Sequence, residues 1–500
     1  MSISNRLSLQ RSRCLAKGLV IASALAAAGC ALTPKDLPHE QDRLAAAGVA
    51  FEPPIEQREL PVPRDAHDWG ALVHRALLAN GELEAAYFEW KAAVEKVTGD
   101  SGWPDTNLAV GYETMFEGPG AFSAGFDAME NLSFPTKTMK AGQVALEEAR
   151  AAAEKFRGAK FALQKRVLDA WLEMVLAAER ERIQSQRREV AGLSSIAGSV
   201  SVTAGEPETA ALQGRLEETR MRNELVTLGS DVRRARAMLA AIVALDTEDI
   251  AVPSHLPSPR PVPSDAVLLA SGARTNPELA ELLAMLQARS KQVDLARMQW
   301  IPDVQPSFSF EDLAVEVLGL MATLPTTIVE IRSSIAQAAA LRSSTAAKIR
   351  QTELDRTGEF VAALIALRNA ERSRAFLENQ VLPVANALVA STRTTYVSGQ
   401  AALNDLVEAH EAVLLARDEI AAAAVERERR VAELEALAGV DMEAIVAGEV
   451  VAVGAAGGAR DGAARLAGGA TGGASGRAAR LAGGLSDEGA AESLAEGAVR

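Results

Sequence analysis

The longest helical pattern in the first half of the chain covers residues 137–201. This stretch contains no proline and is rich in Ala, Glu, Arg, Gln and Leu, which are strong helix formers. At 1.5 Å per residue the predicted helix is roughly 95 Å long, and few globular proteins need such a rod. Gly205 and Pro207 break the pattern, which then resumes to about Leu245. This half therefore predicts a long helical hairpin.

The second half predicts the same arrangement. Helical pattern covers about residues 332–397, breaks at Gly399 and continues to about Val440. Two long hairpins in one chain favour rods packed side by side over ordinary globular domains.

Alternating apolar and polar positions predict two short strands before each long helix. In the first half the apolar positions are Leu108, Val110 and Tyr112, followed after a Gly-Pro-Gly turn by Phe122, Ala124 and Phe126. In the second half they are Val304, Phe308 and Phe310, and residues 313–324 supply the return strand. Membrane barrel strands show such alternation over about ten residues. Four strands cannot close a barrel and lipid does not tolerate an open sheet edge, so the pattern predicts an oligomer.

Four landmarks indicate that the two halves are copies of one unit. They recur in one order, at offsets between 190 and 198 residues. The pairs are Asn80-Gly-Glu-Leu with Asn276-Pro-Glu-Leu, Trp103-Pro-Asp with Trp300-Ile-Pro-Asp, Phe134-Pro with Leu324-Pro, and Gly205 with Gly399. Their agreement predicts a duplicated architecture.

The first 29 residues predict a secretory signal peptide. All charged residues before Gly18 are basic, and an apolar run of about eleven residues follows and ends at small residues. The run is too short to span a membrane, which needs about twenty residues. Removal of the signal shifts the formal net charge from −14 to −18. This acidic balance argues against nucleic acid as a partner.

The end of the signal, Leu25-Ala-Ala-Ala-Gly-Cys30, resembles the lipobox of bacterial lipoproteins. In that motif the Cys is acylated and becomes the first mature residue, although Ala27 stands where the motif usually has Leu. An ordinary signal peptide with an incidental Cys is the alternative. Cys14 is lost with the signal, so Cys30 has no disulfide partner.

Both ends of the mature chain have biased composition. Prolines between residues 34 and 63 predict an extended tether. The Gly- and Ala-rich tail, in which Ala-Ala-Arg-Leu-Ala-Gly-Gly occurs twice, predicts disorder. The predicted organisation is a signal peptide (1–29), a lipidated tether (30–65), a first structural repeat (66–250), a second structural repeat (251–445) and a low-complexity tail (446–500).

Residues 381–414 carry the most specific motif in the chain. Its members in order are Val-Leu-Pro383, Tyr396-Val-Ser-Gly399, Leu403, Asp405, Leu406 and Glu408-Ala. The series resembles the outer-membrane efflux protein family, the TolC-like ducts, and in particular the lipoprotein branch that serves metal-cation and multidrug pumps. The resemblance covers about residues 66–440.

The resemblance implies an α+β membrane protein with long antiparallel α-helical hairpins that form a periplasmic tunnel. Four β-strands per protomer contribute to a trimeric twelve-stranded outer-membrane β-barrel. Such a homotrimer is lipid-anchored in the outer membrane of a Gram-negative bacterium, and it contacts a periplasmic adaptor (membrane fusion) protein and an inner-membrane efflux pump. The resemblance implies passive conduction of solutes, metal cations foremost, with no enzyme activity and no cofactor.

The same resemblance assigns the site residues. Gly205 and Gly399 mark helix tips that contact the adaptor. Asp405 and Glu408 fall where similar ducts place acidic residues around a narrow periplasmic entrance, so three protomers bring six carboxylates together and attract cations. Tyr396 matches a family tyrosine that helps hold the entrance shut.

Each site residue also has a plainer interpretation. A glycine at a helix end serves as an ordinary C-cap. Acids at i and i+3 near a helix start favour the helix dipole and face water, and Tyr396 also fits as a buried packing residue. Ala211 and Ala401 stand where some family members have an acid and a gating Arg, so closure must use other contacts, such as Glu206, Glu208 or apolar packing.

Other functions have little support in the sequence. The five His show no i, i+4 pairing and the eleven Met are scattered, which predicts no bound metal. No phosphate loop, His-Glu-x-x-His helix or nucleophile elbow is present. The alternatives are multidrug efflux, type I protein secretion and a non-pore periplasmic structural lipoprotein. Only the last of these has no need for two matched strand pairs.

Overall fold

The computed structural model describes residues 32–63, 65–102, 107–113, 121–127, 135–203, 208–311, 314–323 and 327–446. The predicted signal peptide, the lipidation candidate Cys30, the tip residue Gly205 and the tail beyond Val446 lie outside these residues.

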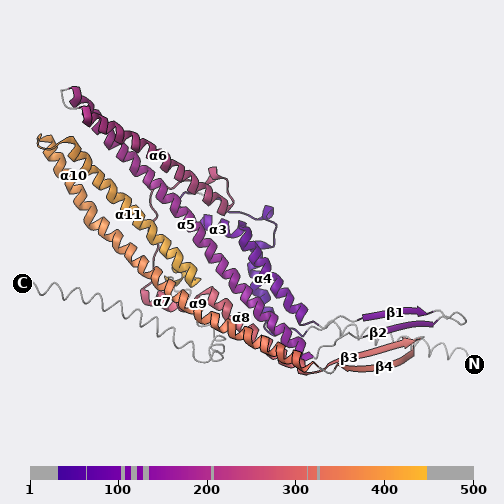
Figure 1. Ribbon diagram of the computed structural model, residues 1–500. Helices are drawn as coiled ribbons and strands as arrows, with labels where there is room; N and C mark the ends of the chain where they lie inside the picture. The colour runs from indigo at the N-terminus through magenta and orange to yellow at the C-terminus, as the bar shows by residue number, and fades with distance from the viewer. Residues whose placement is uncertain are drawn as a thin grey trace, which may run out of the picture. The chain divides into compact units, whose positions relative to one another are not determined.

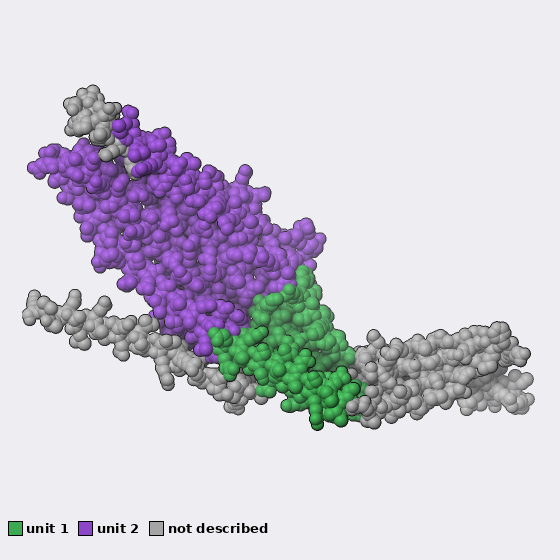
Figure 2. Space-filling model, viewed as in Figure 1, with its two compact units in different colours: residues 1–49, 87–155, 279–351 green, residues 50–86, 156–278, 352–500 purple. Residues whose placement is uncertain are grey.

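The chain divides into two compact units, coloured separately in Figure 2. Unit 1 comprises residues 1–49, 87–155 and 279–351. Unit 2 comprises residues 50–86, 156–278 and 352–500. Each unit combines segments from both halves of the sequence, so the units are distinct from the predicted repeats.

Among its described residues the first half of the chain contains five α-helices, one 3-10 helix and two strands. In order they are α2 (Leu37–Phe51), the 3-10 turn η1 (Ile55–Gln57), α3 (Trp69–Ala79), α4 (Gly81–Asp100), β1 (Asn107–Glu113), β2 (Ala121–Asp127), α5 (Pro135–Thr203) and α6 (Glu208–Val243). Figure 1 labels α3 to α6 and the two strands. The helix predicted over 137–201 is confirmed by α5. Pro135 is its first residue, a position where the missing N–H breaks no helical hydrogen bond.

The second half repeats this order: a helix pair, a strand pair and a long helical hairpin. Its elements are η2 (Thr247–Asp249), α7 (Asp265–Thr275), α8 (Pro277–Arg297), η3 (Met298–Trp300), β3 (Asp303–Glu311), β4 (Ala314–Thr323), α9 (Ile328–Phe376), η4 (Leu377–Val381), α10 (Leu382–Val397), α11 (Leu403–Ala438) and α12 (Met442–Val446). No helix in the described ranges has the length and apolar content needed to cross a membrane.

The helix predicted over 332–397 is interrupted once. Residues 377–381 form a π turn, η4, between α9 and α10. Pro383 is the second residue of α10 and has no N–H to donate to the turn before it. Inserting a π turn is a recognised way to accommodate such a break in the hydrogen-bond ladder. The helical run still ends at Val397, as predicted.

The four strands form one antiparallel sheet in unit 1, in the order β1-β2-β3-β4. Leu108 pairs with Phe126, and Ala124 pairs with Phe310 across the junction between the two strand pairs. The pairing of β3 with β4 shifts register between Ser309 and Phe310. All four strands lie in segments where alternation predicts strands. The sheet is open, with β1 and β4 as its edges.

The prediction of a tether extended throughout is wrong, because α2 occupies residues 37–51. No proline occurs between Pro38, in the first helical turn where proline is tolerated, and Pro53. The helix buries Leu44 and Glu40, and a Glu40 carboxylate oxygen accepts a hydrogen bond from Trp90 Nε1 at 3.1 Å. Tertiary contacts thus stabilise a helix that the proline count concealed.

Arg58 fixes the segment that follows α2. Its Nε donates to the Pro53 carbonyl at 2.8 Å, and its Nη2 donates to the Phe51 carbonyl at 3.0 Å. Its Nη1 donates to the Leu78 carbonyl at 2.8 Å, and both Nη atoms donate to Glu84. All five guanidinium N–H donors therefore have acceptors.

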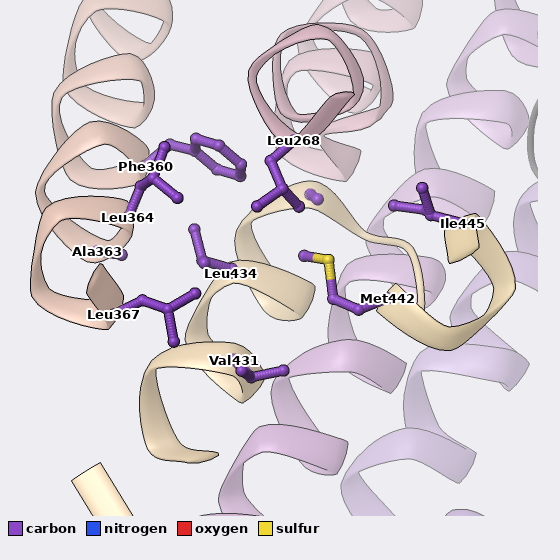
Figure 3. Close-up of a cluster of buried hydrophobic side chains, with 10 residues drawn as sticks. Leu268, Phe360, Ala363, Leu364, Leu367, Val431, Leu434, Met442 and Ile445 are labelled. Atoms are coloured by element: carbon purple, nitrogen blue, oxygen red, sulfur yellow. The ribbon is translucent and has the colours of Figure 1, made fainter. Parts of the chain in front are cut away.

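A hydrophobic cluster in unit 2 joins helices of the second repeat (Figure 3). Its members are Leu268, Phe360, Ala363, Leu364, Leu367, Val431, Leu434, Ala438, Met442 and Ile445. They come from α7, α9, α11 and α12, so α7 seals the side of the long hairpin.

Candidate functional site: the tip of the second helical hairpin

Two predicted site residues, Tyr396 and Gly399, lie where α10 ends. Ser398 is the last residue with helical backbone, and Gly399 follows with φ of +74°, in the left-handed region that favours glycine. The Gly399 N–H donates to the Tyr396 carbonyl at 3.0 Å, and the Gln400 N–H donates to the Thr395 carbonyl at 2.9 Å. This pair of bonds is a Schellman motif. Gly399 therefore closes α10 as a C-cap, and adaptor contact at this glycine stays a prediction.

The start of α11 is fixed by Asp405. Ala402 is the N-cap, with extended backbone, and its side chain offers no hydrogen-bond acceptor. An Asp405 carboxylate oxygen instead accepts the Ala402 N–H at 2.9 Å, which is one half of a capping box. The negative charge also suits the helix N-terminus. The five-residue tip, residues 398–402, is thus held at both ends.

Three predicted entrance residues are exposed in the single chain. The Tyr396 side chain is 40% accessible, so it does not pack inside the described protomer. Asp405 and Glu408 are exposed and three residues apart, which places them on one face of α11. The tip therefore offers two carboxylates and a phenol to solvent or to another chain.

The tip of the first hairpin is described only in part. Gly205 and Glu206 lie outside the described residues, and α6 begins at Glu208, whose side chain is not among those described. The structure therefore brings together Tyr396, Gly399, Asp405 and Glu408, and it does not place Gly205 beside them.

A buried ionic cluster in unit 2 is absent from the sequence predictions. Arg260 Nε donates to Glu428 at 2.9 Å and its Nη1 donates to Glu435 at 2.9 Å. The three residues are only 9%, 5% and 2% accessible, and the Trp69 ring centre lies 5.2 Å from the guanidinium. Burial raises the pKa of Glu435, although its ion pair with Arg260 opposes the shift. The cluster ties the linker before α7 to α11.

The sequence gives a signal for the two acidic members of this cluster but none for Arg260. Glu428 and Glu435 are seven residues apart on a predicted helix and therefore share a face. Arg260 stands among prolines without any pattern, so its partners could not be predicted.

The described ranges contain no convergent set of three or more His, Cys, Asp or Glu side chains that could hold a metal ion. The structure does stack His67 on His255, with ring centroids 3.7 Å apart, although the two residues are distant in sequence. The candidate functional site is the exposed tip that carries Asp405 and Glu408.

Several solved structures with a similar fold are outer-membrane channels. The CmeC outer membrane channel of Campylobacter jejuni aligns with a TM-score of 0.63 at 16% identity, over 74% of this chain and 85% of that one. The outer-membrane channel OprN aligns with a TM-score of 0.64 at 19% identity, over 78% of this chain and 95% of OprN. CusC, whose structures concern folding and transmembrane channel formation, aligns with a TM-score of 0.62 at 14% identity. The alignment covers 76% of this chain and 94% of CusC. The chain shares its fold with these three proteins.

No protein-family model matches the chain, and no curated protein matches it in sequence. The similarity to these channels therefore rests on the arrangement of the backbone alone. It confirms the long helical hairpins predicted from sequence.

Proposed function

We propose that this protein is the outer-membrane channel of a tripartite efflux system. It conducts solutes, metal cations foremost, from an inner-membrane pump and a periplasmic adaptor to the exterior of a Gram-negative cell. The observation that carries the proposal is the extent of the fold match, which covers 85% to 95% of the three channels named above. A match of this extent favours a pore over a structural lipoprotein that uses its helices only for binding.

The open sheet supports assembly into a closed barrel. Each protomer offers four strands with free edges at β1 and β4. Unpaired backbone N–H and C=O groups are not tolerated in lipid, so the edges must pair with those of other protomers. We propose that three copies pair edge to edge as a twelve-stranded barrel, in the range known for outer-membrane barrels.

Exposed apolar residues on α9 and α10 support a homotrimer. Phe376, Val384, Leu388 and Val397 are 51%, 70%, 49% and 80% accessible in the single chain. Apolar side chains repeated along one helical run favour burial against another chain. A neighbouring protomer is the proposed occupant of this surface.

The tips are proposed as the periplasmic entrance and the adaptor contact. Gly205 and Gly399 mark them, and Tyr396 contributes to closure. In a trimer Asp405 and Glu408 contribute six carboxylates to the entrance, which attracts cations and repels anions. The exposure of both acids in the protomer supports this role.

Growth of a deletion strain and its complemented parent tests the proposal. The panel contains copper, silver, zinc, cobalt and cadmium salts, dyes and antibiotics. Hypersensitivity to metals alone is the expected result. Hypersensitivity to organic compounds alone would assign the channel to multidrug efflux. No change in either class would overturn an efflux role and leave protein secretion or a structural role.

A second measurement separates a pore from a scaffold. The purified protein should run as a heat-resistant trimer and should conduct ions across a planar bilayer. Absence of both properties would remove the pore from consideration.

A further inference from the structure

We propose that the sheet-proximal helix ends of unit 1 form a lipid-contacting collar, seated in the head-group layer of the periplasmic leaflet. The collar is defined by Leu32, Met139, Trp300, Ile328 and Val329. The proposal rests on the proposed function, because only a closed barrel would bring these helix ends to the membrane.

The collar residues are large apolar side chains that the protomer leaves exposed. Their accessible fractions are 36% for Leu32, 39% for Met139, 43% for Trp300, 47% for Ile328 and 82% for Val329. Single exposed apolar residues are ordinary on a soluble surface, whereas a group of them marks a contact site.

Hydrogen bonds hold the collar segments together. Lys137, in the first turn of α5, donates to the Ile301 carbonyl at 2.7 Å. Ser334, in the second turn of α9, donates to the side-chain oxygen of Gln299 at 2.6 Å. Both helix starts are therefore fixed to the short segment that contains Trp300.

The position of this segment along the chain points to a membrane interface. Trp300 is three residues before β3, and Val329 is six residues after β4. Trp103, which lies outside the described residues, stands four residues before β1. Two of the five Trp in the chain thus precede the first strand of a pair. Tryptophan is enriched where membrane segments leave the hydrocarbon core, at the level of the head groups.

The leader provides a second, independent indication of lipid. The Leu32 N–H donates to the carbonyl of Ser101, at the end of α4, at 2.9 Å. Pro34 is buried, and its ring lies 3.4 Å from the point where a Cβ on Gly142 of α5 would stand. Leu32 is therefore held beside the sheet-proximal ends of α4 and α5.

The predicted acyl chain would start next to the collar. Cys30 is two residues before Leu32, and two residues span at most about 7 Å. One acyl chain alone binds a membrane only marginally, and stable anchoring takes a second contact. The collar supplies that contact for the same leaflet, which favours lipid over a second protein chain as its occupant.

Lipid quenching of a single fluorophore tests the collar. The predicted processing removes Cys14 with the signal and acylates Cys30, which would leave the mature chain without a free thiol. Val329→Cys in the full chain therefore gives one labelling position. Val226→Cys on α6, where the native side chain is 65% accessible, is the matched control. Both labelled proteins are reconstituted in phosphatidylethanolamine–phosphatidylglycerol vesicles that contain lipids with a shallow nitroxide.

Several-fold stronger quenching at position 329 than at position 226 is the expected result. Equal quenching at the two positions would overturn the collar. A label at 329 that is protected from both nitroxide lipid and aqueous iodide would also overturn it, because another copy of the chain would then cover this surface. Ile328→Cys repeats the measurement at a neighbouring position.

Conductance measured on the same vesicles distinguishes failure of the collar proposal from failure of the proposed channel function. Conducting vesicles without quenching at 329 would refute the collar and leave the channel intact. If the unmodified protein does not conduct ions in these vesicles, the proposed function itself is refuted.

Discussion

One left-handed residue decides how α10 ends. Gly399 has φ of +74°, yet a Cβ added there would meet no atom within 4 Å. Glycine is therefore required by backbone conformation and not by lack of space. Gly439, at the end of α11, also has a positive φ, of +64°. It differs from Gly399 because a Cβ at position 439 would lie 2.8 Å from a Pro277 ring carbon. The tip can thus be altered at Gly399 without creating a clash.

Gly399→Ala should lower the free energy of unfolding by about 1 kcal/mol, because an L-residue is disfavoured in the left-handed region. Gly358→Ala is the matched control. Gly358 lies in the interior of α9 with φ in the ordinary range and no atom near its Cβ position, so alanine should stabilise by about 0.5–1 kcal/mol. Chemical denaturation followed by circular dichroism measures both, and shifts of the same sign would contradict the role of Gly399.

Charge at the tip can be separated from helix capping. Asp405→Asn with Glu408→Gln removes both charges and retains an oxygen that can accept the Ala402 N–H. The double variant should lose cation selectivity in a bilayer while α11 stays capped. Glu419→Gln, at an exposed position farther along α11, is the control. An unchanged reversal potential in the double variant would exclude the two carboxylates from the entrance.

At the scale of elements, the buried Arg260 cluster determines how the linker before α7 meets α11. Arg260 bridges Glu428 and Glu435, and its carbonyl accepts a hydrogen bond from Arg427 at 2.8 Å. A partly dehydrated cluster of this kind depends on every partner, because a buried charge left unpaired is strongly destabilising. We therefore expect protonation within the cluster to affect the packing of the two elements.

Glu435→Gln should flatten the pH dependence of stability. Burial raises the pKa of Glu435 above its ordinary value of 4.5. The folded chain therefore holds this proton more tightly than the unfolded chain. The resulting stabilisation is complete below pH 4.5 and is lost as pH rises through the raised pKa. Glutamine does not titrate, so that loss should disappear.

Thermal unfolding midpoints between about pH 4 and pH 8 measure this effect. Glu419→Gln on the exposed face of α11 should follow the wild-type curve. Parallel curves for Glu435→Gln and wild type would show that Glu435 does not titrate differently in the folded state.

At the scale of the whole molecule, the sequence predicts that the chain is attached to the membrane through its N-terminus. Cys30→Ala should abolish incorporation of a radiolabelled fatty acid, because the thiol is the only acylation point in the predicted lipobox. Whole cells labelled with palmitate and immunoprecipitated give the measurement. Undiminished labelling of the variant would rule the lipobox out.

The other end of the chain should be dispensable. Deletion of residues 455–500 is expected to leave metal resistance unchanged, because the segment has too little apolar surface to offset its ordering entropy. Resistance is scored at matched protein levels by immunoblot. Lost resistance at a normal protein level would assign the tail a role in export.

Local sequence determines the long elements of this protein. Residues 137–201 form helix in the structure, as predicted from strong helix formers without proline, which favour helix at each turn. The alternation around Leu108 and Phe308 likewise coincides with strands. The spacing of Asp405 and Glu408 already placed both acids on one helix face.

Tertiary structure decides those features whose stability depends on residues distant in the sequence. Helix α2 forms in a proline-rich leader because Leu44 and Glu40 are buried against other segments. Arg260 meets its two carboxylates across more than 160 residues, and no local pattern encodes such a contact. The edge strands β1 and β4 have an open side within the described sheet, and in the proposed barrel other copies of the chain would pair with them. Propensity and periodicity act within a few turns, whereas burial and charge pairing are settled only when remote segments pack together.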